Sequence, residues 1–222
     1  MSGNRLIMAD WNPNRKILTL KVVFYGPALS GKTTNLIALH DLIEPTLKGD
    51  MQVLETKNDR TLFFDLLPLG IRTQDNTLIK LKLYTVPGQV VHNSTRKAVL
   101  SRCDGVVFVA DSQTSQSENN AASFNNLAEN MRLLGLDMQN LPLVVQFNKR
   151  DLLEIESETD LNHRWQNTPW KLFYASALNK EGVLETFEEL LSQLYLSIEE
   201  EFELNSTHGL SEASFIQHIT AG

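Results

Sequence analysis

Residues 26–33 carry the residue types and spacing of a phosphate-binding loop. They read Gly-Pro-Ala-Leu-Ser-Gly-Lys-Thr and match the pattern Gly-x4-Gly-Lys-Ser/Thr. In such a loop, consecutive backbone amides surround a phosphate, and the helix that follows directs its positive N-terminus at the anion. We expect Lys32 to reach the β- and γ-phosphates of a nucleotide, and the Thr33 hydroxyl to ligate Mg²⁺, which prefers oxygen donors. The expected contacts come from Gly26, Ala28, Leu29, Ser30, Gly31, Lys32, Thr33 and Thr34.

A second polar segment, Asn148-Lys149-Arg150-Asp151, has the residue types that recognise guanine. Guanine presents two N–H donors on one edge, and the single carboxylate of Asp151 can accept both. Adenine presents an acceptor at that edge and would leave the carboxylate unpaired. Lys149 can lay its alkyl stem over the ring, and Asn148 can tie the loop together and meet the base edge. Alone, the four residues would also fit a helix N-cap followed by an exposed charge pair.

The elements that must position these loops alternate between strand and helix patterns. Apolar, β-branched runs predict strands, and apolar residues spaced three and four apart predict helices. The expected strands cover 17–25, 77–84, 106–110, 141–147 and 171–174, and the expected helices cover 32–43, 123–134 and 183–198. Both polar loops therefore follow strands, at the edge where open α/β sheets bind ligands. That context favours phosphate binding over an ordinary glycine-containing turn at 26–33. Backbone amides of Ser176 and Ala177, after the last strand, would meet the guanine oxygen.

This alternation predicts an α/β protein with a mostly parallel sheet and helices on both faces. No repeat or linker divides the chain, so we expect a single domain over residues 1–202. Residues 10–14 predict a turn that joins a short N-terminal extension, with an extra strand, to the first main strand. Residues 45–76 are polar and give no clear assignment. Residues 203–222 are expected to form a polar, loosely held tail.

Composition excludes several classes of protein. The 222 residues are 42% hydrophobic and 21% charged, values that argue against a disordered chain, a fibre or a disulfide scaffold. The net charge of −7 argues against broad nucleic-acid binding. The single cysteine, Cys103, fits a reducing cytoplasm. No apolar run approaches the roughly 18 residues of a membrane span. Trp165 and Trp170 are expected to be packing residues.

The phosphate loop, the Asn148 segment and Ser176-Ala177 stand in the order found in Ras-like small GTPases. This resemblance covers about residues 17–200. Through residues 26–36, 60–65, 85–89 and 148–151, the chain resembles the bacterial polarity GTPases of gliding motility more closely. The resemblance implies a three-layer P-loop NTPase fold of the Ras-like kind, binding of GTP and GDP with Mg²⁺, and hydrolysis of GTP by in-line attack of water.

The segment Thr85-Val86-Pro87-Gly88 stands where most small GTPases have Asp-x-x-Gly. Thr85 has no carboxylate, so the usual acidic, water-mediated hold on Mg²⁺ is missing, although the polarity GTPases are similar at this position. The backbone amide of Gly88 can still meet the γ-phosphate. Gln89 follows directly, and a glutamine at this place orients the attacking water in the phosphoryl-transfer template.

Arg60-Thr61 lies where the resemblance places the first switch. Thr61 would complete Mg²⁺ coordination when the γ-phosphate is present. Arg60 is similar to the arginine that the polarity GTPases supply from their own chain, and it would neutralise charge on the transferring phosphate. The catalytic residues implied are therefore Gln89, Arg60 and Lys32, and the metal ligands are Thr33 and Thr61.

The resemblance implies a molecular switch whose γ-phosphate holds two loops. We expect slow basal hydrolysis, a roadblock/LC7-type activating partner, and polarity or motility effectors that recruit the protein to a cell pole or a membrane surface from the cytoplasm. Two other functions remain open at this point. One is a nucleotide-binding scaffold with little hydrolysis, because Thr85 weakens the metal site. The other is a P-loop kinase or ATPase.

Overall fold

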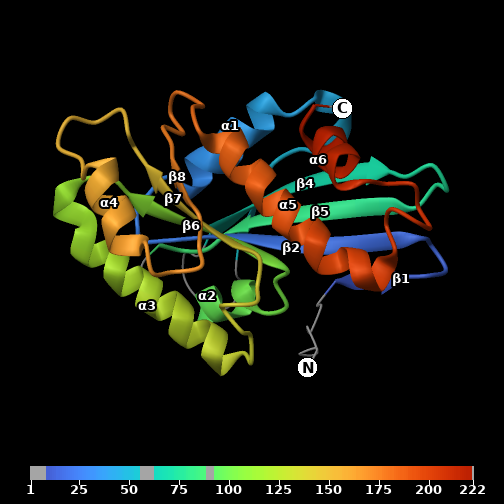
Figure 1. Cartoon of the computed structure of the whole chain (residues 1–222), viewed down its shortest axis with the longest axis horizontal. Coiled ribbons are helices and arrows are strands. Elements are labelled where there is room, and N and C mark those ends of the chain that lie inside the picture. The colour runs from blue at the N-terminus through green and yellow to red at the C-terminus, as the bar shows by residue number, and fades with distance from the viewer. Residues whose placement is uncertain (1–8, 56–62, 89–92, 222) are drawn as a thin grey trace.

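The computed structural model describes residues 9–55, 63–88 and 93–221, and in these residues an eight-stranded sheet has helices on both faces (Figure 1). The strands run in the order β3-β4-β5-β2-β6-β7-β8, and β1 pairs with β2. The predicted α/β architecture with a mostly parallel sheet is confirmed: β5, β2, β6, β7 and β8 pair in parallel, and β1, β3 and β4 join the sheet through antiparallel pairing. The strands are β1 (Asp10–Asn12), β2 (Ile17–Tyr25), β3 (Gln52–Glu55), β4 (Phe63–Arg72), β5 (Leu78–Thr85), β6 (Gly105–Asp111), β7 (Leu143–Asn148) and β8 (Leu172–Tyr174).

The helices divide between the two faces of the sheet. Helices α1, α5 and α6 cover one face, and α2, α3 and α4 cover the other, as Figure 1 shows. Their bounds are α1 (Lys32–Leu42), α2 (Asn93–Leu100), α3 (Ser117–Leu133), α4 (Glu158–Trp165), α5 (Val183–Phe202) and α6 (Glu212–Thr220). Two short 3₁₀ turns occur at Pro45–Leu47 and Thr114–Gln116.

The central strand β2 shows why the sheet needs cover on both sides. Successive side chains of a strand point to opposite faces. Val22 and Phe24 belong to the core beneath α1 and α5, whereas Val23 and Tyr25 belong to the core beneath α3. All four are at most 1% exposed. A strand buried on both faces has a continuous apolar sequence, and this pattern made β2 predictable.

The parallel strands bring their carboxyl ends to one edge of the sheet. Tyr25 is in register with Phe108, Asp111 with Asn148, and Phe147 with Tyr174. The loops after β2, β7 and β8 therefore lie at the same edge, although they are far apart in the sequence.

Residues 45–76, unassigned from the sequence, contain β3 and the antiparallel strand β4. Helices α2 and α4, on the face of the sheet that α3 also covers, were not predicted either. Helix α3 was predicted to begin at residue 123 but begins at Ser117. Helices α2 and α4 have only eight residues each, so few apolar positions mark them. The segment predicted as a turn at 10–14 holds β1, and the turn covers residues 13–16.

The expectation of a loosely held tail after residue 202 is wrong. Helix α6 packs on α5 with Phe215 fully buried and Ile219 1% exposed. The Ser211 hydroxyl caps the helix by accepting the Ser214 amide at 3.2 Å, and Tyr195 Oη on α5 donates to the Leu210 carbonyl at 3.0 Å. Apolar residues four apart are enough to anchor this short helix, although the tail is polar on average. No helix in the described ranges is long and apolar enough to cross a membrane.

Candidate nucleotide-binding site

The loop between β2 and α1 is preorganised to receive an anion. Gly31 precedes the first turn of α1 with φ of 97°, a left-handed conformation that favours glycine. A Cβ at Gly31 would lie 2.1 Å from Asn148 Nδ2, so no side chain fits there. No side chain caps the helix, and its first-turn amides remain available to a ligand. Residues Gly26, Ala28, Leu29, Ser30, Gly31, Lys32, Thr33 and Thr34 all lie in this loop and at the start of α1.

Lys32 is buried inside this loop. Its Nζ donates to the Pro27 carbonyl at 2.6 Å and to the Gly26 carbonyl at 3.3 Å. The pKa of Lys32 is lowered to about 7, chiefly by burial and also by the Arg96 guanidinium, while the Asp65 carboxylate opposes this change. The Ser30 hydroxyl is buried and has no hydrogen-bond partner within the described part of the chain. A buried cation and an unpaired hydroxyl in one loop fit an anionic ligand.

A carboxylate lies beside Thr33, but it comes from β4. Asp65 Oδ2 accepts the Thr33 hydroxyl at 2.5 Å and the Thr85 hydroxyl at 3.1 Å, and the Asp65 amide donates to Thr85 Oγ1 at 2.9 Å. Asp65 is 7% exposed. Hydroxyl and carboxylate oxygens are the donors that Mg²⁺ prefers, so this donor set fits the ion. In the described ranges no three His, Cys, Asp or Glu side chains gather into a larger metal-binding group.

The sequence reasoning missed Asp65. It noted that position 85 lacks an acidic side chain, but Asp65 stands opposite that position on the neighbouring antiparallel strand, next to the Leu66–Tyr84 pair. A prediction of this pairing required β4, which the sequence pattern did not yield.

A cavity of about 370 Å³ extends from the start of α1 to the segment after β5. Gly88 closes one side of it, and a Cβ on Gly88 would lie 2.3 Å from the Cα of Ala28. The segment after β5 therefore contacts the phosphate loop, as its predicted role requires. Three predicted site residues, Arg60, Thr61 and Gln89, lie outside the described residues. The cavity is lined by Leu29, Gly31, Lys32, Thr33, Thr34, Asp65, Thr85, Val86, Pro87 and Gly88.

Asn148 joins the loops from three parts of the chain. Its Nδ2 donates to the Ser30 carbonyl at 2.8 Å, and its Oδ1 accepts the Ala177 amide at 2.9 Å. Asn148 is 2% exposed, so both bonds form away from water. One side chain thus holds together the predicted phosphate loop (residues 26–33) and the two predicted guanine-binding segments (148–151 and 176–177), which we call the base loops.

The other base-loop residues are fixed by charge pairing and hydrogen bonds. Lys149 Nζ donates to Asp111 Oδ2 at 2.6 Å, which restricts the position of the lysine side chain. Asp151 is exposed, and its Oδ1 accepts the Ser176 hydroxyl at 2.6 Å. Asp111 was not predicted from the sequence as a site residue, although its position at the end of β6 could have indicated that role. An ionised carboxylate has about four acceptor positions, so Asp151 can accept two further N–H donors beside the Ser176 hydroxyl.

This fold and this site define a small GTPase. Residues 11–194 match the ADP-ribosylation factor family, and the chain belongs to that family. The chain is 42% identical over 185 residues to the mutual gliding-motility protein MglA of Myxococcus xanthus strain DK1622, a match that covers 82% of this chain and 93% of the relative. The predicted resemblance to Ras-like small GTPases and to the polarity GTPases of gliding motility is confirmed.

Proposed function

We propose that this protein is a GTP-hydrolysing switch that binds GTP and GDP together with Mg²⁺. The main support is Asn148, which joins the phosphate loop at Ser30 to the base loop at Ala177. A nucleotide would then lie with its phosphates at the start of α1 and its base between Lys149 and Asp151. Asp151 selects guanine because its carboxylate accepts both N–H donors of that base.

Thr33, with Thr61 in the GTP-bound state, would ligate the metal, and Asp65 would supply the negative charge that position 85 lacks. Support comes from the bonds of Asp65 to both threonine hydroxyls. Bound Mg²⁺ neutralises phosphate charge. A buried carboxylate beside a ligating hydroxyl orients that ligand and strengthens the site. This proposal counts against the scaffold alternative, whose basis was a metal site without a carboxylate.

Catalysis by this chain would use three residues. Lys32 contacts the β- and γ-phosphates, Gln89 orients the attacking water, and Arg60 neutralises charge on the transferring phosphate. Family membership supports the role of Gln89, and the similarity to the gliding-motility relative supports that of Arg60; both roles fit the phosphoryl-transfer template. Basal hydrolysis is slow because Arg60 acts only when a partner positions it.

The output of the switch is a change in affinity for partners. The name of the 42%-identical relative supports a role in gliding motility, and a role in cell polarity belongs to the same proposal. The activator is a roadblock/LC7-type protein that positions Arg60, and effectors recruit the protein from the cytoplasm to a pole or a membrane surface.

Single-turnover hydrolysis of GTP, with and without a roadblock partner, tests this proposal. We expect slow release of phosphate alone and acceleration of about 10³-fold or more with the partner, the range that a correctly placed arginine supplies. Arg60→Ala should abolish the acceleration, whereas Arg72→Ala, a matched change at an exposed arginine of β4, should leave it intact. No phosphate release under either condition would favour the scaffold, and equal binding of ATP would favour a kinase or ATPase.

A further inference from the structure

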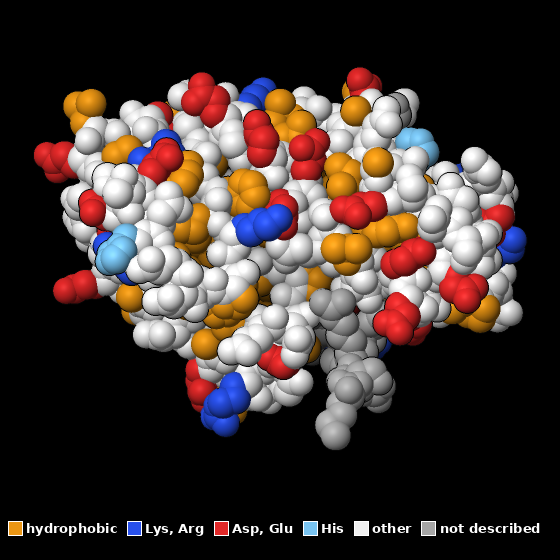
Figure 2. All heavy atoms as spheres, in the orientation of Figure 1, with side chains coloured by type: hydrophobic (Ala, Val, Ile, Leu, Met, Phe, Trp, Pro, Cys, Tyr) orange, Lys and Arg blue, Asp and Glu red, His pale blue; other side chains and the backbone are white. Residues whose placement is uncertain are grey.

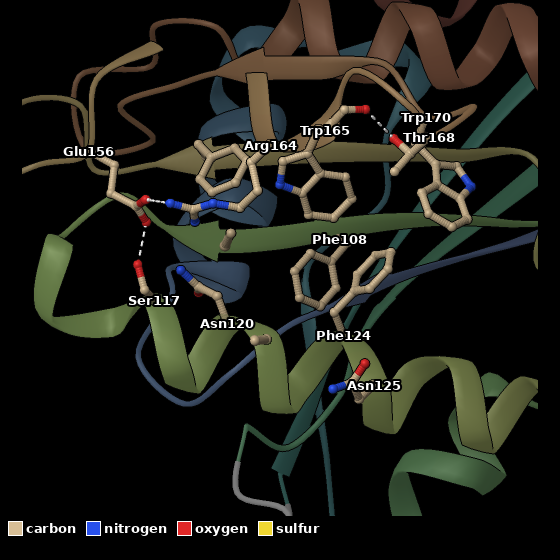
Figure 3. Close-up of a pocket in the computed structure, with 13 residues that line it drawn as sticks. Phe108, Ser117, Asn120, Phe124, Asn125, Glu156, Arg164, Trp165, Thr168 and Trp170 are labelled. Carbon is tan, nitrogen blue, oxygen red and sulfur yellow. Dashed lines mark hydrogen bonds and ion pairs between the residues drawn. The ribbon is translucent and has the colours of Figure 1, made fainter. Parts of the chain in front are cut away.

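A second cavity, of about 260 Å³, lies between α3 and the segment 156–170 (Figure 3). Its floor is formed by side chains of β6 and β7, including Phe108 and Phe147. It shares no lining residue with the nucleotide site. In Figure 2, hydrophobic side chains reach the surface in the region of α3 and α4.

Five aromatic side chains line the cavity: Phe108, Phe124, Phe147, Trp165 and Trp170. The ring centre of Phe124 lies 4.9 Å from that of Phe108, 4.9 Å from that of Trp165 and 5.2 Å from that of Trp170, all edge-to-face. Figure 3 shows these four rings gathered on one side of the pocket, with Glu156 and Ser117 on the other. Walls of this kind favour a flat ring system, because stacked and edge-to-face contacts add to the burial of apolar area.

The opposite end of the cavity holds a buried carboxylate. Glu156 is 8% exposed; its Oε1 accepts the Ser117 hydroxyl at 2.5 Å, and its Oε2 pairs with Arg164. An ionised carboxylate offers about four acceptor positions, and an arginine offers five donors. The described contacts of Glu156 and Arg164 leave positions free on both groups. The Glu156 carboxylate, an acceptor, and the Arg164 guanidinium, a donor, therefore lie side by side at one end of this largely apolar cavity.

The backbone around Glu156 is fixed in advance. Its amide donates to the Ser112 carbonyl at 2.9 Å, and its carbonyl accepts Arg150 Nη1 at 2.7 Å. A ligand does not have to order this end of the cavity, so little binding energy is lost to reorganisation. The opposite charges of Glu156 and Arg164 neutralise each other. This end of the cavity therefore gives a charged ligand little electrostatic stabilisation.

We propose that this cavity binds a flat, uncharged, two-ring heteroaromatic molecule whose edge carries an N–H beside a C=O. The N–H donates to Glu156, the C=O accepts from Arg164, and the rings contact Phe124 and Trp165. Because Glu156 is buried, the site rejects an analogue that offers this carboxylate no N–H donor, whereas the exposed Arg164 contributes less to this selectivity.

The probe is quinazolin-4(3H)-one, which has this edge, and its comparator is 3-methylquinazolin-4(3H)-one, which lacks the donor. Binding is measured by calorimetry and ligand-observed NMR on full-length protein saturated with GDP and Mg²⁺, so that the guanine site is occupied. We expect a Kd on the order of 0.1–1 mM for a ligand of this size. The methylated comparator should bind at least tenfold more weakly, because one charge-assisted hydrogen bond is lost.

Two neighbouring alanines of α3 give a matched pair of variants. Ala121 lines the cavity and is exposed, and Ala122 is exposed but does not line it. Ala121→Trp should reduce probe binding at least tenfold, and Ala122→Trp should leave it unchanged. Retained GDP and an unchanged melting temperature establish that both variants fold. The proposal is overturned if the wild type does not bind the probe at millimolar concentration, if Ala121→Trp binds it normally, or if both compounds bind equally.

Discussion

Replacement of Asp65 by asparagine tests the unusual metal site most sharply. The substituted side chain would keep the shape and one acceptor oxygen but would lose the charge. A cation ligated by Thr33 Oγ1 at about 2.1 Å would lie within about 4.6 Å of Asp65 Oδ2, because that oxygen is 2.5 Å from the hydroxyl. Even at the dielectric constant of water, a divalent cation and a carboxylate at that separation interact by about 2 kcal/mol. This energy corresponds to about a 20-fold loss of Mg²⁺ affinity, within the roughly 10–100-fold range for residues that orient metal ligands.

The assay follows release of a fluorescent GDP while Mg²⁺ is titrated. The Mg²⁺ concentration that half-maximally slows release should rise about 20-fold in Asp65→Asn. Asp50→Asn, a matched change at an exposed acid, should not move it. The double variant Asp65→Asn/Thr85→Asp should recover part of the loss, because it returns a carboxylate to the neighbouring strand. An unchanged midpoint in Asp65→Asn would refute the reasoning.

Three further predictions concern other parts of the chain. Asp151→Asn should weaken GDP binding by about 10²–10⁴-fold and increase binding of xanthosine diphosphate, since two charge-assisted hydrogen bonds of about 1.5–3 kcal/mol each are lost. Phe215→Ala should lower the free energy of unfolding by about 3–5 kcal/mol in urea titrations, because the ring is fully buried. Burial raises the pKa of Asp104 to about 7, so the ionised carboxylate destabilises the folded state. The stability of the wild type relative to Asp104→Asn should therefore fall as pH rises from about 4 to about 7, by up to about 4 kcal/mol.

Each of these predictions has a clear contrary result. Unchanged base preference in Asp151→Asn would remove the basis for guanine selection. A loss below about 1 kcal/mol in Phe215→Ala, similar to that of the exposed Gln217→Ala, would mean that α6 is not anchored. A stability difference between wild type and Asp104→Asn that stays constant from about pH 4 to about pH 8 would contradict a buried, protonated Asp104.

The sequence predicted the parts of the fold that depend on local patterns. Strands β2, β6 and β7 are buried on both faces, so they appear as continuous apolar runs, and the glycines and lysine of residues 26–33 have a spacing with a specific chemical meaning. The pairing of Asn148 with Ser30 and Ala177 follows from the parallel arrangement, which brings these loops to one edge of the sheet.

Features that depend on pairing between distant segments were not predictable in this way. Asp65 reaches Thr33 only because β4 runs antiparallel to β5, and the sequence around Asp65 does not mark that register. Trp165 and Trp170 were expected to be packing residues; they pack, partly buried, against the core and also line the second cavity. Residues Arg60, Thr61 and Gln89 lie outside the described residues, and their roles stay predictions.

Competition between nucleotides on the wild-type protein tests the central claim most directly. With Mg²⁺ in excess, a fluorescent GDP should bind saturably, unlabelled GTP and GDP should displace it, and ATP should require at least about a 10³-fold higher concentration, since a carboxylate that recognises guanine discriminates strongly. Displacement by ATP at the same concentration as GTP, or no binding of labelled GDP at all, would contradict the account.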